Sequence, residues 1–175
     1  MLKKLFGFDK KGKSAVNMPE ATGKDVLMSP ITGDIVSLSE VPDPTFSQKM
    51  LGDGVAVKPK GTTVVAPTYG EIIQVFPTKH ALGLKTVNGI ELLIHIGLET
   101  VSMKGEGFQA FVKEGDKVAQ GDKLIEFDIR LIEEKATSTI TPIIITNVDA
   151  VESLVKEKNI SAVAGETAIM TVVTK

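Results

Sequence analysis

The sequence predicts an all-β protein: an antiparallel β-sandwich or barrel-sandwich with duplicated β units and one or more short helices. Short runs rich in β-branched and aromatic residues alternate with Gly and Pro turns from Val26 onward, a pattern typical of sandwiches and barrels. The segment SPITGDIV at 29–36 is echoed by APTYGEII at 66–73, which indicates a duplicated unit. A length of 175 residues with 42% apolar content suits one domain with a sizeable core.

The apolar runs predict the strands in chain order. They are expected at 34–38, 54–58, 62–66, 70–76, 81–87, 90–96, 108–112, 123–127, 142–146 and 167–173. One short helix is expected near 148–157, with Asn147 as its N-cap and with one apolar face made of Ala150, Val151, Leu154 and Val155. The segment at 112–128 contains two Gly-Asp turns, six residues apart, around a strand-like run.

The first 24 residues are expected to form a flexible basic N-terminal tail, ahead of a single domain in residues 25–175. Residues 1–13 hold five lysines and one aspartate, so they carry +4 of the total charge of −2 and leave −6 on the rest. This mildly acidic body argues against nucleic acid as a partner. The tail is either a solvated segment or an amphipathic contact with an anionic membrane surface, through Leu2, Leu5, Phe6 and Phe8.

Hydropathy and cysteine content point to the cytoplasm. No apolar run approaches the ~18 residues that a membrane span needs, and the apolar part of MLKKLFGF is too short for a signal peptide. The sequence has no Cys, which excludes disulfides, thiol catalysis and thiolate metal sites within it.

The chain has only two histidines, His80 and His95, and the sequence predicts that they meet. Asn88-Gly89 lies between two apolar runs, the strongest short hairpin signal. A two-residue loop there would place Leu82 opposite His95, and His80 opposite Gly97. Because side chains alternate between faces, the two histidines would then be diagonal neighbours on one face, with Cα atoms roughly 7–8 Å apart.

The neighbours of the two rings suggest a site. Gly97 would leave room beside His80 and expose a backbone N–H beside His95, and the hydroxyl of Thr78 could fix the tautomer of His80. An apolar rim is expected from Phe46, Phe76, Leu82 and Leu93. The residues alone allow three interpretations: a hydrogen-bonded structural pair, a metal site completed by Glu99 or Asp43, and nucleophilic catalysis by histidine.

Four segments together strongly resemble the glucose-type IIA component of the bacterial phosphoenolpyruvate:sugar phosphotransferase system: LLIHIGLETVSMKGEGF, FPTKHALGL, VPDPTFSQKMLGDGVAVKP and EFDIRLIEEKATSTITPIIIT. The resemblance covers roughly residues 25–173. It implies a β-sandwich with a shallow apolar depression around the histidines. It also implies a phosphohistidine at His95, a supporting role for His80, and a hydrogen bond from Thr78 to His80.

The resemblance further implies the partners. The phosphocarrier protein HPr would donate the phosphoryl group, and the cysteine of the IIB domain of a sugar permease would accept it. Asp43 and Glu99 match acidic positions that meet a basic residue of the donor, although some relatives have aspartate where Glu99 stands. The expected partner-binding surface consists of Asp43, Glu99, Phe46, Phe76, Leu82, Leu93 and Val101. Since this sequence has no Cys, the IIB domain is expected on a separate chain, which would bring the protein transiently to the inner face of the membrane.

Three alternatives stay in view. A zinc peptidase on a similar duplicated β-scaffold would use HIGLE as part of its ligand motif, but a separate HxH is missing. A swinging carrier would modify Lys104, but the full Met-Lys-Met loop is missing. A purely regulatory binding module would need no transfer; there, zinc held by His80 and His95 would be completed by a partner. Phosphoryl transfer itself requires no cofactor.

Overall fold

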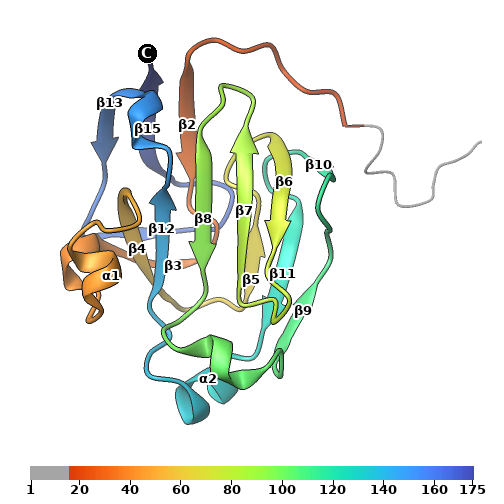
Figure 1. Ribbon diagram of the computed structural model, residues 1–175, viewed down its shortest axis with the longest axis vertical. Coiled ribbons are helices and arrows are strands. Elements are labelled where there is room, and N and C mark those ends of the chain that lie inside the picture. The colour runs from red at the N-terminus through yellow and green to blue at the C-terminus, as the bar shows by residue number, and fades with distance from the viewer. Residues whose placement is uncertain (1–15) are drawn as a thin grey trace, which may run out of the picture.

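The computed structural model describes residues 16–175 and is dominated by antiparallel strands (Figure 1). The strands are β2 (Lys24–Met28), β3 (Gly33–Ser37), β4 (Asp53–Pro59), β5 (Thr63–Val65), β6 (Gly70–Val75), β7 (Ala81–Thr86), β8 (Glu91–His95), β9 (Phe108–Ala110), β10 (Lys117–Val118), β11 (Lys123–Phe127), β12 (Thr141–Ile145), β13 (Val151–Lys156), β14 (Ile160–Ala162) and β15 (Ala168–Thr174). The helices are α1 (Pro44–Ser47), α2 (Ile129–Lys135) and the 3₁₀ turns η3 (Leu38–Glu40), η4 (Thr100–Met103) and η5 (Val148–Ala150). The predicted all-β class is confirmed. None of these helices is long and apolar enough to span a lipid bilayer.

The largest sheet in residues 16–175 is built from two equivalent halves. Its order is β10-β6-β7-β8-β12-β4-β3-β14, and the two echoed segments lead into β6 and β3, which occupy equivalent places. Both echoes have Gly because a Cβ at Gly33 would lie 2.3 Å from the Lys58 carbonyl, and one at Gly70 would lie 2.4 Å from the Lys85 carbonyl. The predicted duplication is therefore confirmed. The sheets β5-β11-β9 and β13-β15-β2 complete the fold.

The eight-stranded sheet buries side chains on both faces. One face supplies the main core, which includes the fully buried Leu84, Leu92 and Ile94. The other face is covered by the η3–α1 segment, which forms a smaller apolar cluster of Val36, Leu38, Val41, Phe46, Ala56, Leu98, Ile140 and Ile144, with Leu93 packed against it. Because side chains alternate along β8, His95 lies on this second face together with Leu93.

The predicted two-residue hairpin loop is wrong. Lys85 pairs with Glu91, and the Thr86 N–H donates to the Ile90 carbonyl at 2.8 Å, so the loop has three residues. Gly89 has a φ of +89°, whereas Asn88 is not among the residues with positive φ. A type I′ turn needs positive φ at both central residues. The register shifts by one, and Ala81 rather than Leu82 lies opposite His95.

The helix expected near 148–157 is also wrong, since only η5 is helical there and residues 151–156 form β13. Asn147 does not cap η5 with its side chain; its amide instead bonds the backbone of Glu91 and Gly89. The prediction also missed the short strands β2, β10 and β14 and the helices α1 and α2.

Asn88 anchors the segment that precedes β2. Its Oδ1 accepts from the amides of Thr22 and Gly23, both at 2.7 Å. Its Nδ2 donates to the Lys24 carbonyl at 3.1 Å and to Asp25 Oδ1 at 2.8 Å. Residues 22–24 of the predicted tail are therefore hydrogen-bonded to the domain. Residues 1–15, with the proposed membrane contact, lie outside the described residues.

We expect Asn88→Ala to lower the free energy of unfolding by about 1–3 kcal/mol, because it removes the hydrogen bonds to the amides of Thr22 and Gly23 and one of the two side-chain hydrogen bonds to the buried Asp25. Urea unfolding followed by circular dichroism measures the change. The exposed Asn17 offers a matched control, and Asn17→Ala should leave the midpoint within a few tenths of a kcal/mol. Equal midpoints for the two variants would contradict the anchoring role.

Candidate functional site

The two histidine rings lie together where β7 begins and β8 ends. Figure 1 shows that these strand ends point toward α2. His95 is the last residue of β8, and His80 directly precedes β7. Their ring centroids are 4.9 Å apart, and the rings meet edge-on at 81°. The expected meeting of the two rings is confirmed.

The two rings do not meet through the alternation of side chains along paired strands, as expected, but through a turn before β7. His80 stands in a tight turn, in which the Phe76 N–H donates to the Ala81 carbonyl and the Lys79 N–H donates to the Phe76 carbonyl. Lys79 has a φ of +63°, which is uncommon for a residue other than glycine. The regular alternation of β7 therefore does not extend to His80.

The tautomer of His95 follows from its hydrogen bond. Its Nδ1 lies 2.9 Å from the Gly97 carbonyl. A carbonyl can only accept, so Nδ1 carries the proton, and in the neutral ring Nε2 keeps its lone pair. Gly97 suits this geometry because its φ is +74°, and a Cβ would lie 2.7 Å from Thr100 Cγ2 and 2.8 Å from the Ser138 carbonyl. Gly97 is not opposite His80, as expected earlier; it contacts His95 through its carbonyl.

His80 is held by the residue that the sequence indicated. Its Nδ1 lies 2.5 Å from Thr78 Oγ1, and only 3% of its surface is exposed. When the Thr78 hydroxyl donates to Nδ1, the proton of the neutral ring resides on Nε2. This pairs a proton donor on His80 with a lone pair on His95.

Burial keeps both rings uncharged. Burial first, and then the neighbouring His95, lower the pKa of His80 to about 4. The pKa of His95 is also lowered by burial, although hydrogen bonds to the backbone of Gly97 and of His95 itself and the charge of Asp43 oppose the shift. Both imidazoles are therefore neutral near pH 7, the form in which histidine is a nucleophile.

The short helix α1 places an acid and an aromatic ring beside His95. Asp43 caps its N-terminus by accepting from the Thr45 N–H at 3.0 Å, a contact typically worth about 1 kcal/mol. The Phe46 ring lies 5.2 Å from the His95 ring. Because Phe46 is only 4% exposed, it shapes the site and offers little area to a partner, which corrects its assignment to the contact surface.

The remaining rim residues differ in exposure. Phe76 is half-buried with its ring 5.5 Å from His80, Leu93 is half-buried, and Val101 is 56% exposed. Leu82 is fully buried in the main core, so its predicted place on the rim is wrong; the one-residue register shift turns it inward.

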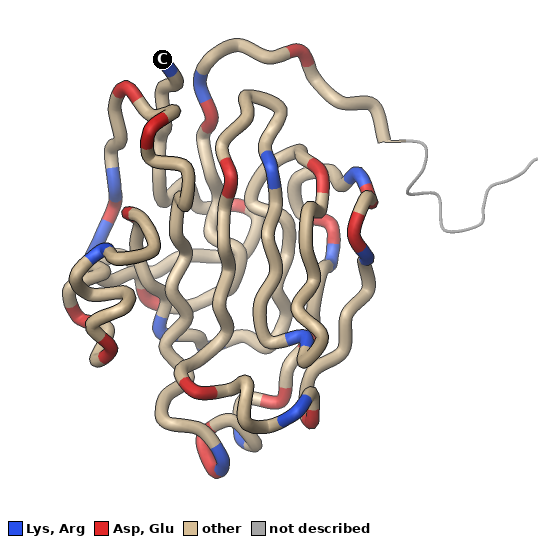
Figure 2. The backbone as a smooth tube through the Cα atoms, viewed as in Figure 1, with Lys and Arg blue, Asp and Glu red and all other residues tan. Residues whose placement is uncertain are grey.

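Charged residues are found around the site, but the middle of the strands beneath it has none. Figure 2 shows Lys, Arg, Asp and Glu mostly near strand ends and loops, while the middle of β7, β8 and β12 carries none. Asp43 is half-buried, and Glu99 is exposed at the start of η4 with a φ of +61°. Glu99 follows β8, which ends at His95, whereas Asp43 belongs to the start of α1 and acts on His95 through its charge.

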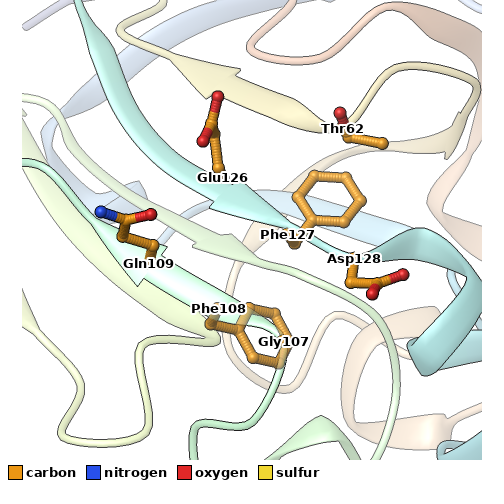
Figure 3. A pocket seen from close by; sticks show the side chains of 7 residues that line it. All are labelled: Thr62, Gly107, Phe108, Gln109, Glu126, Phe127 and Asp128. Atoms are coloured by element: carbon orange, nitrogen blue, oxygen red, sulfur yellow. The ribbon is translucent and has the colours of Figure 1, made fainter.

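One groove lies away from the histidines. A groove of about 460 Å³ is lined by Thr62, Gly107, Phe108, Gln109, Glu126, Phe127 and Asp128 (Figure 3), and neither histidine lines it. Within residues 16–175, no three His, Cys, Asp or Glu side chains come together to hold a metal ion. The two Nε2 atoms could supply two zinc ligands, so a zinc ion would need further ligands from a partner.

Comparisons with known proteins define the class and then the family. A solved structure, the glucose permease IIA from Mycoplasma capricolum, superposes with a TM-score of 0.80 at 38% identity, over 85% of this chain and 96% of that one. The fold is thus that of a IIA β-sandwich. The family described as phosphoenolpyruvate-dependent sugar phosphotransferase system, EIIA 1, matches residues 25–151, and the chain belongs to this family.

Curated relatives of this chain belong to the same phosphotransferase system. The glucose-specific EIIA component of Halalkalibacterium halodurans is 55% identical over 172 residues, which cover 98% of each chain. That of Bacillus cereus is 51% identical over 175 residues, the full length of both. The chain is therefore a phosphotransferase component that carries phosphoryl groups between proteins of this system.

We expect the lowered pKa of His80 to make stability depend on pH. Between its folded pKa of about 4 and its ordinary value of 6.5, the unfolded chain binds more protons. Stability is then fully present above about pH 6.5 and decreases as the pH falls toward 4, by about 3 kcal/mol at most. Urea unfolding at pH 7.5 and 4.5 should show a smaller decrease for His80→Gln than for the wild type. Equal decreases would contradict a buried neutral ring.

Proposed function

We propose that His95 Nε2 accepts a phosphoryl group from the phosphohistidine of HPr and passes it to the cysteine of the IIB domain of a sugar permease. The observation that carries this proposal is the hydrogen bond from His95 Nδ1 to the Gly97 carbonyl, because it leaves the Nε2 lone pair for attack. The names of the relatives, which are glucose-specific EIIA components, support glucose as the sugar.

The transfer balances without a net proton change at His95. The Nε2 lone pair forms a P–N bond while the P–N bond of the donor breaks, and the donor imidazole leaves with its electron pair. The proton on Nδ1 stays in place, hydrogen-bonded to Gly97. In the second step a cysteine thiolate of the acceptor attacks phosphorus, and His95 leaves as the same neutral tautomer.

His80 acts as a donor to the moving group. Its neutral ring, with Nδ1 bound to Thr78, presents Nε2–H toward phosphoryl oxygens in a site largely shielded from water. The backbone N–H of Gly97 is proposed as a second donor. The half-buried Phe76 and Leu93 restrict water, which would otherwise hydrolyse the P–N bond.

Asp43 and Glu99 attract the donor, and the exposed Val101 provides apolar contact beside them. Acidic groups around an apolar docking surface raise the rate of encounter with a basic partner. Delivery to a membrane-bound permease would take place at the inner face of the membrane.

A regulatory complex is the second candidate function. The Nε2 atoms of His80 and His95 are outside the Nδ1 hydrogen bonds. Together they would supply half of a tetrahedral zinc site once His80 takes its other tautomer, in which Nδ1–H donates to the Thr78 oxygen and Nε2 has the lone pair. A partner carboxylate would have to complete it. Phosphoryl transfer itself uses only the residues of the two proteins.

We expect His95→Gln to abolish phosphorylation and His80→Gln to retain it while slowing release. Incubation with phosphoenolpyruvate, enzyme I and HPr should add one phosphate to the wild type, labile to acid and stable to base, and none to His95→Gln in intact mass spectra.

For His80→Gln, single-turnover transfer to a IIB domain should slow by ~10²–10³-fold, the usual cost of losing one such donor. Acceptance should slow less, because HPr brings cationic groups of its own. Phosphate mapped to residue 80, or equal slowing of both steps, would contradict the assignment.

Neutralising Asp43 and Glu99 should slow acceptance from HPr chiefly at low salt. Asp43→Asn retains an N-cap side chain for α1, so the double variant with Glu99→Gln tests charge. The matched control is Glu152→Gln with Glu157→Gln, which removes two exposed charges at β13. The defect should shrink as salt screens the attraction; a defect that ignores ionic strength would point to lost structure instead.

A further inference from the structure

The turn after His95 is held by a buried threonine that the transfer chemistry does not use directly. Thr100 is fully buried, and its hydroxyl donates to the Ile96 carbonyl at 2.6 Å. Its methyl group occupies the space beside Gly97, since a Cβ on Gly97 would lie 2.7 Å from Thr100 Cγ2. Thr100 thus contacts the turn through both branches of its side chain.

The backbone of this turn, from the Ile96 N–H to the Leu98 N–H, is held by four hydrogen bonds. The Ile96 N–H donates to the His80 carbonyl at 2.7 Å, and the Ile96 carbonyl is held by Thr100. In the following peptide, Gly97–Leu98, the Leu98 N–H donates to the Ser138 carbonyl at 2.9 Å. Its other end, the Gly97 carbonyl, accepts from His95 Nδ1.

This geometry gives Thr100 influence over two functional groups. Peptide bonds are trans here, so the Gly97 N–H points opposite to the Ile96 carbonyl, away from Thr100. Rotation of that peptide would also displace the Gly97 carbonyl that selects the His95 tautomer. Without the hydroxyl, the buried Ile96 carbonyl would lose its side-chain partner and the turn would relax.

We propose that Thr100 is a positioning residue for phosphoryl transfer. Its hydroxyl fixes the Ile96–Gly97 peptide and thereby the position of Gly97, whose carbonyl holds the His95 ring in the tautomer that presents Nε2. The inference rests on the proposed role of His95 as the phosphorylated residue.

The test compares Thr100→Val, which keeps the bulk and removes the hydroxyl, with Thr100→Ser, which keeps the hydroxyl and removes the methyl group. Nitrogen-15 NMR of the histidine side chains at pH 7.5 reports the tautomer of His95, and single-turnover assays with phosphorylated HPr report transfer. We expect Thr100→Val to mix the two tautomers of His95 and to slow transfer at saturating donor about tenfold, the loss of one hydrogen bond. Thr100→Ser should keep the wild-type tautomer and stay near the wild-type rate.

Thr86→Val is the matched control, because Thr86 is also buried and hydrogen-bonded, to Asp25, at the far end of β7. It should lower stability and leave the His95 signals unchanged. The proposal is overturned if Thr100→Val keeps the wild-type tautomer and rate, if Thr100→Ser is as defective as Thr100→Val, or if Thr86→Val alters the His95 signals equally. If the tautomer shifts as expected while phosphate in the wild type maps to another residue, the inference stands and the proposed function fails.

Discussion

The hydrogen bond from His95 Nδ1 to the Gly97 carbonyl is the constraint on which the site depends. It decides which nitrogen keeps a lone pair, and it requires a chain that turns back sharply within two residues. That turn needs a positive φ and no side chain at residue 97, because the Ser138 carbonyl and Thr100 occupy the adjacent space. The hydrogen bond between His95 and Gly97 therefore depends on three segments: the end of β8, η4, which contributes Thr100, and the segment after α2, which contributes Ser138.

The duplicated sheet has this site in only one of its halves within the described chain. The pair Ile94–Ile143 lies at the centre of the strand order, and the equivalent registers Ala81–His95 and Gly54–Ile144 place Ile144 where the other half has His95. Ile144 is buried in the apolar cluster beneath α1. One half therefore packs against the η3–α1 segment, which places Phe46 against the histidine of the other half.

Sequence patterns predicted the fold class and the duplication, because Gly positions and β-branched runs act locally. The meeting of the histidines was predicted from a register that is wrong by one residue; the rings meet because His80 lies in the turn before β7. Sequence patterns did not predict the hairpin register, since the Asn88 amide is engaged by residues 22–25, more than sixty positions away in sequence. Nor did they predict β13, whose strand form depends on pairing with the distant β15. Ser138 was missed for the same reason: its contribution is a backbone carbonyl, which no side-chain motif reveals.

In the proposed role of His95, the neutrality of both rings would favour release of the phosphoryl group after it has been accepted. A cationic partner beside a phosphohistidine would stabilise the bound phosphoryl group strongly. Burial lowers the pKa of His80 to about 4, so near pH 7 it offers a neutral N–H, which holds anionic phosphoryl oxygens less strongly than an imidazolium would. Cationic help would then come from the docked donor and leave with it. Desolvation of the His80 ring lowers stability below pH 6.5. Because the same desolvation keeps the ring neutral, it would also keep the phosphoryl group transferable.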